Sequence, residues 1–236
     1  MAKPVLLNNI DHKDLRVNTR QGRGLTDSHA YVQTFAAEFR LLQAHYPIIF
    51  RKQSEAHPYE PVALFGFETD ENLFLEEDRW DAPTLPLLVE RLPFMIGRDG
   101  DELVIHIDVD SPRISTTEGE PIFLPHGGMS PYLEQVNSML LTIHEGMGAN
   151  AAFVEALVKH ELIESFSLDI TLDDGSQNRL AGFYTINEER LAALDGAALD
   201  SLHKAGWLAP IYFQIASLSN FRALIDRKNA RRAVHA

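Results

Sequence analysis

The stretch that decides the fold is residues 94–113, which read FMIGRDGDELVIHIDVDSPR. Two apolar runs, 94–97 and 103–109, flank the polar turn RDGD at 98–101. Glycine supplies the positive φ that tight hairpin turns require, so the pattern predicts a β-hairpin. Side chains alternate across a strand, which places Val104, His106 and Asp108 on the outward face of the second strand.

Hairpin patterns also occur on both sides of this stretch. Upstream, the short apolar runs 47–52 and 61–67 are separated by a polar turn. Downstream, residues 166–172 and 179–186 flank the turn DDGS at 173–176. Helical spacing dominates the second half, and no strand–helix–strand repeat is present. The order predicts an α+β fold, with an antiparallel hairpin-rich sheet in the first half and helices concentrated in the second half.

Capping residues predict where the later helices begin and end. Ser130 precedes a helical pattern that Gly146 or Gly148 can close. Three more polar residues are expected to cap further helices: Asn150, Asn187 and Asp195. The apolar residues between 210 and 224 predict one last, well-buried helix.

Length and composition indicate a globular chain of one main domain. Its 236 residues are 45% hydrophobic and 23% charged, which allows a sizeable core. No internal repeat or long linker marks a boundary. We expect an extended N-terminal arm at 1–30, a single α+β domain at 31–226 and a basic C-terminal tail at 227–236.

The same composition excludes several classes of site. The chain has no cysteine, so disulfides, thiolate metal sites and cysteine nucleophiles are absent. The first apolar run, residues 5–7, is too short for a signal-peptide core. No stretch approaches the roughly 18 to 20 apolar residues of a membrane helix, so we expect no integral membrane segment and a cytoplasmic location.

Charge is distributed unevenly along the chain. Residues 1–24 carry five Lys or Arg against two Asp, and residues 222–236 carry five against one. The formal net charge is −13, which leaves −20 for residues 25–221. Such an acidic body should repel nucleic acid. A basic tail could bind an acidic partner, although a solvated helix end explains the same residues.

The common nucleotide and hydrolase motifs are missing, and the strongest remaining cluster is residues 106–113. On a strand, His106 and Asp108 share one face about 7 Å apart. With His126 or His144 they could form a two-histidine, one-carboxylate iron centre, in which Arg113 would anchor an acidic co-substrate. Asp108 and Asp110 could instead hold a divalent cation by themselves.

The alternative explanation is structural. Asp108 and Asp110 would then bind backbone groups or Arg113 at the strand end, because Asp-Ser-Pro sequences are typical of turns. His106 would be a half-buried strand residue. No set of residues forms a convincing catalytic site, so the sequence favours a chain that is not an enzyme and that needs no cofactor.

Segments from the start to near the end of the chain resemble the SapC family, which is associated with surface-layer protein secretion. They are 12–16 (HKDLR), 36–39, 46–48, 61–66 (PVALFG), 71–74, 107–113 (IDVDSPR), 119–123, 130–133 (SPYL), 182–184, 191–194, His203 and 211–212. The family pattern keeps D-x-D-S-P-R while the position of His106 varies. The resemblance therefore favours Asp108, Asp110 and Arg113 for any ligand site.

The resemblance supplies no catalytic residues, but it implies a setting. Genes of the family often lie beside those for TonB-dependent receptors, flavin-dependent halogenase-like proteins and iron-dependent hydroxylases. This association implies a role in bacterial outer-membrane uptake or surface-layer systems. The sequence thus predicts an accessory or binding protein that acts with a protein partner. A metal-dependent enzyme using His106, Asp108, Asp110 and His126 is the alternative hypothesis.

Overall fold

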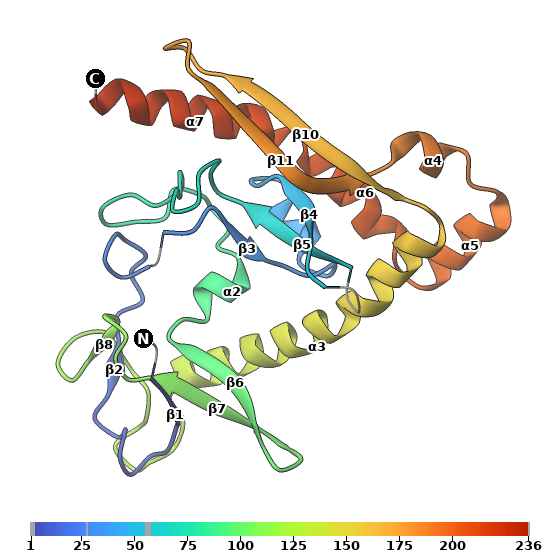
Figure 1. The fold of residues 1–236 in the computed structure, drawn as a ribbon. Coiled ribbons are helices and arrows are strands. Elements are labelled where there is room, and N and C mark those ends of the chain that lie inside the picture. The colour runs from blue at the N-terminus through green and yellow to red at the C-terminus, as the bar shows by residue number, and fades with distance from the viewer. Residues whose placement is uncertain (1–2, 27, 55–57, 236) are drawn as a thin grey trace. The chain divides into compact units, whose positions relative to one another are not determined.

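The computed structural model describes residues 3–26, 28–54 and 58–235. The chain divides into two compact units (Figure 1), and each is assembled from separate stretches of sequence. Unit 1 comprises Met1–Asp27, Leu75–Asp81 and Leu87–Glu145. Unit 2 comprises Ser28–Phe74, Ala82–Pro86 and Gly146–Ala236.

Unit 1 is built around the hairpin that the sequence predicts. Strands β6 (Phe94–Asp99) and β7 (Glu102–Asp108) pair in antiparallel register, and β1 (Pro4–Leu6) pairs with the other edge of β7 (Figure 1). A second small sheet has the order β8-β2-β9. Its strands are β2 (Arg16–Val17), β8 (Ile114–Ser115) and β9 (Glu120–Pro121). The predicted N-terminal arm is thus extended at β1 and β2, and both strands are paired.

The core of unit 1 lies on the inner face of the β1-β7-β6 sheet. Phe94 and Ile107 are neighbours across β6 and β7, and each is fully buried. They pack with residues of β2, the 122 region and helix α3: Val17, Ile122, Leu133, Val136 and Leu140. Burial of Ile107 leaves His106 and Asp108 on the opposite face, as the alternation predicts. The short helix α2 (Leu87–Glu90) precedes β6.

Helix α3 (Pro131–Lys159) is longer than the sequence predicts. Ser130 caps it as expected, since its Oγ accepts a hydrogen bond from the Leu133 N–H at 3.1 Å. The predicted end at Gly146 or Gly148 is wrong, because the helix continues through both. At Gly146 a Cβ would lie 2.2 Å from the Phe35 ring, so the missing side chain serves close packing rather than termination.

Asn150 is likewise inside α3 and caps no helix. Its amide nitrogen donates to the Thr34 carbonyl at 2.9 Å, and its amide oxygen accepts from the Ala36 N–H at 3.2 Å. The polar residue expected at a helix start therefore joins α3 to a distant stretch of unit 2.

Unit 2 contains a five-stranded antiparallel sheet with the order β10-β11-β4-β5-β3. The predicted hairpins are both present, as β4 (Ile48–Lys52) with β5 (Tyr59–Leu64) and β10 (Ile163–Thr171) with β11 (Gln177–Ile186). Strand β3 (Tyr31–Gln33) adds to the free edge of β5. The short helix α1 (Phe39–Leu42) lies between β3 and β4 in the chain.

The remaining helices of unit 2 follow β11. Helix α4 (Glu188–Ala192) and helix α5 (Gly196–Lys204) begin at the predicted caps, Asn187 and Asp195. The single last helix predicted from residue 210 is wrong, because it is two helices, α6 (Leu208–Ser217) and α7 (Asn220–His235). In α6 the fully buried Gln214 donates to the Ile48 carbonyl at 2.8 Å and thereby ties the helix to β4.

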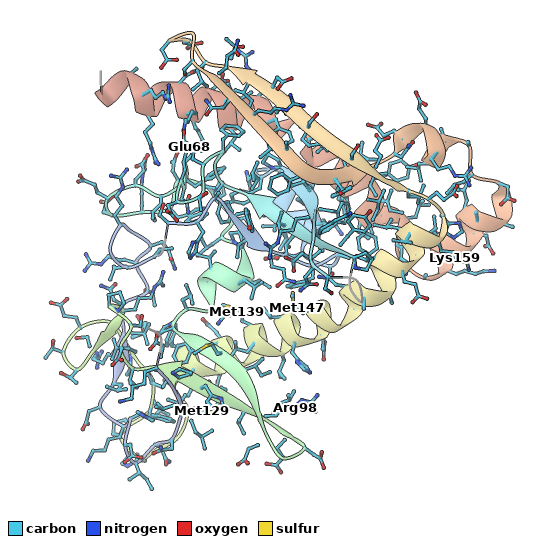
Figure 2. All side chains as sticks on the ribbon, viewed as in Figure 1. Glu68, Arg98, Met129, Met139, Met147 and Lys159 are labelled. Carbon is cyan, nitrogen blue, oxygen red and sulfur yellow. The ribbon has the colours of Figure 1, made fainter. Side chains whose placement is uncertain are left out.

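The basic residues predicted to form a tail lie on helix α7 and contact unit 2 itself. Lys228 is 4% exposed, and its Nζ lies 2.6 Å from Glu68 and also binds Glu71. Arg232 lies 2.6 Å from Asp174. Arg227 stacks over the Phe74 ring at 4.5 Å. Figure 2 labels Glu68 on the loop facing α7.

Antiparallel sheets dominate the first half and helices the second, so the predicted α+β class is confirmed. No helix of the described residues is both long enough and apolar enough to cross a membrane. The division into an arm, one domain and a tail stays a prediction.

Candidate functional site

A cavity of about 600 Å³ lies in unit 1, where β7 ends and the chain turns toward β8. Its polar lining is made of Arg91, Asp108, Asp110, Ser111 and Arg113. Its apolar lining is made of Leu25, Leu92, Pro93, Met95 and Pro112. The three residues that the sequence nominates for ligand binding, Asp108, Asp110 and Arg113, therefore line one cavity. Volumes of 300 to 1,000 Å³ are usual for small-molecule sites.

Backbone hydrogen bonds fix the two aspartates at the rim of this cavity. The Asp108 N–H donates to the Pro93 carbonyl at 3.0 Å, which joins the end of β7 to the start of β6. The Asp108 Oδ1 accepts from the Lys3 N–H at 2.8 Å and from the Asp110 N–H at 3.2 Å. Asp108 is half-buried and thus partly committed to the backbone, whereas the Asp110 side chain is exposed.

Arg113 supports the cavity wall. It is only 1% exposed, and its Nε donates to the Leu25 carbonyl at 2.8 Å. Its Nη2 donates to the Thr26 hydroxyl at 2.7 Å and also to the Gln21 side chain. These contacts hold segment 21–26 in place, as a planar guanidinium with several donors is suited to do. Arg113 therefore supports the wall of the cavity through its hydrogen bonds to residues 21–26.

Arg91 is the cationic residue of the cavity that sequence reasoning missed. It directly follows α2, is half-buried, and donates through Nη1 to the Phe94 carbonyl at 2.6 Å. Because the Arg91 guanidinium is partly removed from water, its burial lowers its pKa. The only sequence signal was an arginine between a short helix and Pro93, which is too common a pattern to nominate a site.

Tyr132, which packs beside the unit 1 core, is influenced by the charge of Arg113. Burial raises the pKa of Tyr132 to about 12, and the nearby Arg113 charge opposes this rise. Burial thus favours the neutral form of the Tyr132 hydroxyl.

The structure does not support the metal-centre alternative. His106 packs against Gly97, where a Cβ would lie 2.5 Å from the imidazole ring, and His126 is exposed in the turn that follows Leu124. Asp108 is engaged with backbone N–H groups instead. In the part of the chain that the structure describes, no group of three or more His, Asp or Glu side chains is placed to hold a metal ion.

A second cavity, of about 490 Å³, lies in unit 2 beside α3 and β5. The buried polar residues of its lining, Glu60 and Asn150, are bonded to the protein. Glu60 is 3% exposed, pairs with Arg51 and accepts from Gln33 at 2.9 Å. Asn150 makes the two hydrogen bonds described above. Much of the remaining lining is apolar, as at Met147 and Val154.

Comparison with known proteins gives one clear result. A family model described as SapC matches residues 7–224, which is most of the chain and includes the whole 108–113 segment. No curated protein and no solved structure matches the chain.

Proposed function

The chain belongs to the SapC family, and from this premise and the unit 1 cavity we propose that it is a non-catalytic accessory protein that binds a small polar ligand. Asp108, Asp110 and Arg113 are the proposed site, with Arg113 supporting the wall and the aspartates reaching the ligand. The protein acts with a protein partner in bacterial outer-membrane uptake or surface-layer systems, in the cytoplasm.

One observation carries the ligand-binding part of this proposal. The D-x-D-S-P-R segment, which resembles the family pattern, does not merely close a turn, because it forms one side of a 600 Å³ cavity that also contains Arg91. Charged side chains around a hollow of this size are typical of small-molecule sites. The residues present favour binding over catalysis, since among the described residues no hydrogen bond joins the Ser111 hydroxyl to Asp108 or Asp110, and that hydroxyl accepts from the Arg113 N–H instead.

Partner binding rests on a different observation. The acidic body should repel nucleic acid, and the basic residues of α7 contact the chain's own Glu68, Glu71, Phe74 and Asp174. We therefore expect partner recognition through the body of the protein rather than through a free basic tail.

Native mass spectrometry tests ligand binding directly. The protein is purified from lysate without denaturation, and the expected result is an added small-molecule mass that is lost on unfolding. Met95→Trp places a larger side chain at the cavity wall and should remove that mass. Met129→Trp is the matched control, because Met129 is exposed and does not line the cavity (Figure 2).

A wild-type protein that carries no ligand, and gains none from a metabolite extract, would contradict the binding proposal. So would a ligand that remains in a folded Met95→Trp variant. Affinity capture tests the accessory role separately. The expected result is a partner that is retained by this chain and absent from an unrelated protein of the same net charge.

A further inference from the structure

Arg91 and the two aspartates of the unit 1 cavity do not pair with one another in the described parts of the chain. Across residues 3–26, 28–54 and 58–235, no ion pair joins the Arg91 guanidinium to Asp108 or Asp110. The Arg91 side chain has one protein acceptor, the Phe94 carbonyl, and the Asp110 carboxylate has no hydrogen-bond donor among the same residues. Because the guanidinium and the carboxylates are not paired with each other, each is available to a charged group of a ligand in the cavity.

The arginine side of the cavity suits a carboxylate. Guanidinium groups bind carboxylates through parallel, charge-assisted hydrogen bonds, which are stronger than neutral ones. Arg91 is half-buried, and the lowered pKa of its guanidinium reflects the loss of hydration. A bound anion would replace that lost hydration.

The aspartate side suits a protonated amine. Asp110 presents an exposed carboxylate, and Asp108 uses one carboxylate oxygen, Oδ1, for both of its backbone hydrogen bonds. An ammonium group has three donors and can bind both carboxylates at once. The same carboxylates disfavour phosphate or any other anion without a cationic group, because like charges repel.

The cavity lining is also partly apolar, through residues that include Leu92, Pro93 and Met95. We propose that the cavity binds a free α-amino acid with a large apolar side chain, its carboxylate on Arg91 and its ammonium on Asp108 and Asp110. This inference rests on the proposed function, since it names the ligand of the same cavity. The volume of about 600 Å³ leaves space for the side chain beside the two charged groups.

Three related probes separate the two charges. L-phenylalanine carries both groups, 2-phenylethylamine lacks the carboxylate, and 3-phenylpropanoate lacks the amine. Calorimetric titration should show binding of L-phenylalanine that is at least about tenfold tighter than that of either analogue, because each charge-assisted pair contributes separately.

Two substitutions then locate each contact. Arg91→Gln should weaken L-phenylalanine by at least about tenfold and leave 2-phenylethylamine unchanged, and Asp110→Asn should weaken the amino acid while sparing 3-phenylpropanoate. The matched controls are Arg98→Gln and Asp101→Asn, which remove the same charges at exposed positions near the tip of the β6–β7 hairpin. Figure 2 labels Arg98 on that hairpin. Both controls should bind L-phenylalanine like the wild-type protein.

The outcomes distinguish this inference from the proposed function. If either analogue binds as tightly as L-phenylalanine, or if none of the three binds while native mass spectrometry detects a ligand that Met95→Trp removes, the amino-acid inference is overturned and the binding function stands. If no probe binds and no ligand is detected, both are overturned. Equal losses in the variants and in their controls would also overturn the inference.

Discussion

The two cavities of this protein differ in how their polar groups are used. In unit 2, Glu60 is paired with Arg51, and both ends of the Asn150 amide bind backbone groups. In unit 1, Arg91 and Asp110 line a cavity of similar size without an ion pair between them, within the described stretches of the chain. The buried polar groups of the unit 2 cavity already have partners and contribute to stability, whereas Arg91 and Asp110 in unit 1 are available to a ligand.

Helix α7 extends this contrast, because unit 2 also pairs the buried charge on its last helix. Lys228 binds both Glu68 and Glu71. If the contrast is sound, substitutions at the paired groups of unit 2 should lower stability strongly. Substitutions at the open charges of unit 1 should affect ligand binding and leave stability almost unchanged.

The largest effect is expected for Lys228→Met. Removing the ammonium leaves the mostly buried Glu71 carboxylate without its cation, and losing one partner of a buried ion pair costs about 3 to 5 kcal/mol. Urea unfolding followed by circular dichroism measures this loss. Lys159→Met makes the same chemical change at the exposed end of α3 (Figure 2), and should shift the unfolding free energy by less than about 0.5 kcal/mol. Similar losses of unfolding free energy in both variants would contradict the view that unit 2 is stabilised by its paired buried charges.

Asn150→Ala should come next. It leaves the Thr34 carbonyl and the Ala36 N–H without their side-chain partner, and each unsatisfied buried group costs about 1 to 3 kcal/mol. Urea unfolding again measures the loss of unfolding free energy. Glu155→Ala is the control, because Glu155 lines the same cavity but is exposed. A loss at Asn150 no greater than at Glu155 would show that the unit 2 cavity is not held by its polar contacts.

A smaller effect on stability is expected when the pH is lowered. The hydrogen bond and charge of Lys228 lower the pKa of Glu68, so the folded chain binds this proton less readily than the unfolded chain. The Glu68–Lys228 pair therefore contributes its full stability above the ordinary glutamate pKa of about 4.3. This contribution is lost as the pH falls through the lower pKa that Glu68 has in the folded chain. Melting temperatures from pH 6 downward should therefore fall less steeply for Lys228→Met than for wild type. If the melting temperatures of the two proteins fell equally steeply with pH, the Glu68–Lys228 pair would not be the source of this acid sensitivity.

The smallest effect on stability is expected for Asp110→Asn. The carboxylate is exposed and has no ion pair in the described chain, so the unfolding free energy should change by less than about 0.5 kcal/mol. Thermal unfolding without ligand measures this change. A loss above 1 kcal/mol, well beyond the surface range, would mean that Asp110 holds the turn together and would weaken its assignment to a ligand.

Local patterns predicted much of this fold. The three hairpins and the caps at Ser130, Asn187 and Asp195 depend on residues near one another in sequence, so they could be deduced from spacing alone. The course of α3 could not. Gly146 lies inside the helix and makes room for the ring of Phe35, a residue more than 100 positions away, so its role could not be deduced from its neighbours in sequence.

The candidate site shows the same limit. Asp108, Asp110 and Arg113 are close in sequence, so one motif nominated all three. Arg91 joins them only because β6 returns beside β7, and the pairing of the Asp108 N–H with the Pro93 carbonyl brings the two stretches together. The role of Arg113 as a wall support was also hidden, since its partners at 21–26 come from a strand-poor stretch near the N-terminus.

Each of the two units is assembled from separate stretches of sequence, which limits how a unit can be removed or exchanged. Unit 1 draws on three separate stretches and unit 2 on three others, with residues 145 and 146 on either side of the division inside α3. No single continuous gene fragment encodes either unit, so neither can be gained, lost or exchanged as a cassette. The chain crosses between the units at 27–28, 74–75, 81–82, 86–87 and 145–146, and the last of these crossings lies inside α3. A deletion that removes either unit must therefore remove several separate segments of the chain.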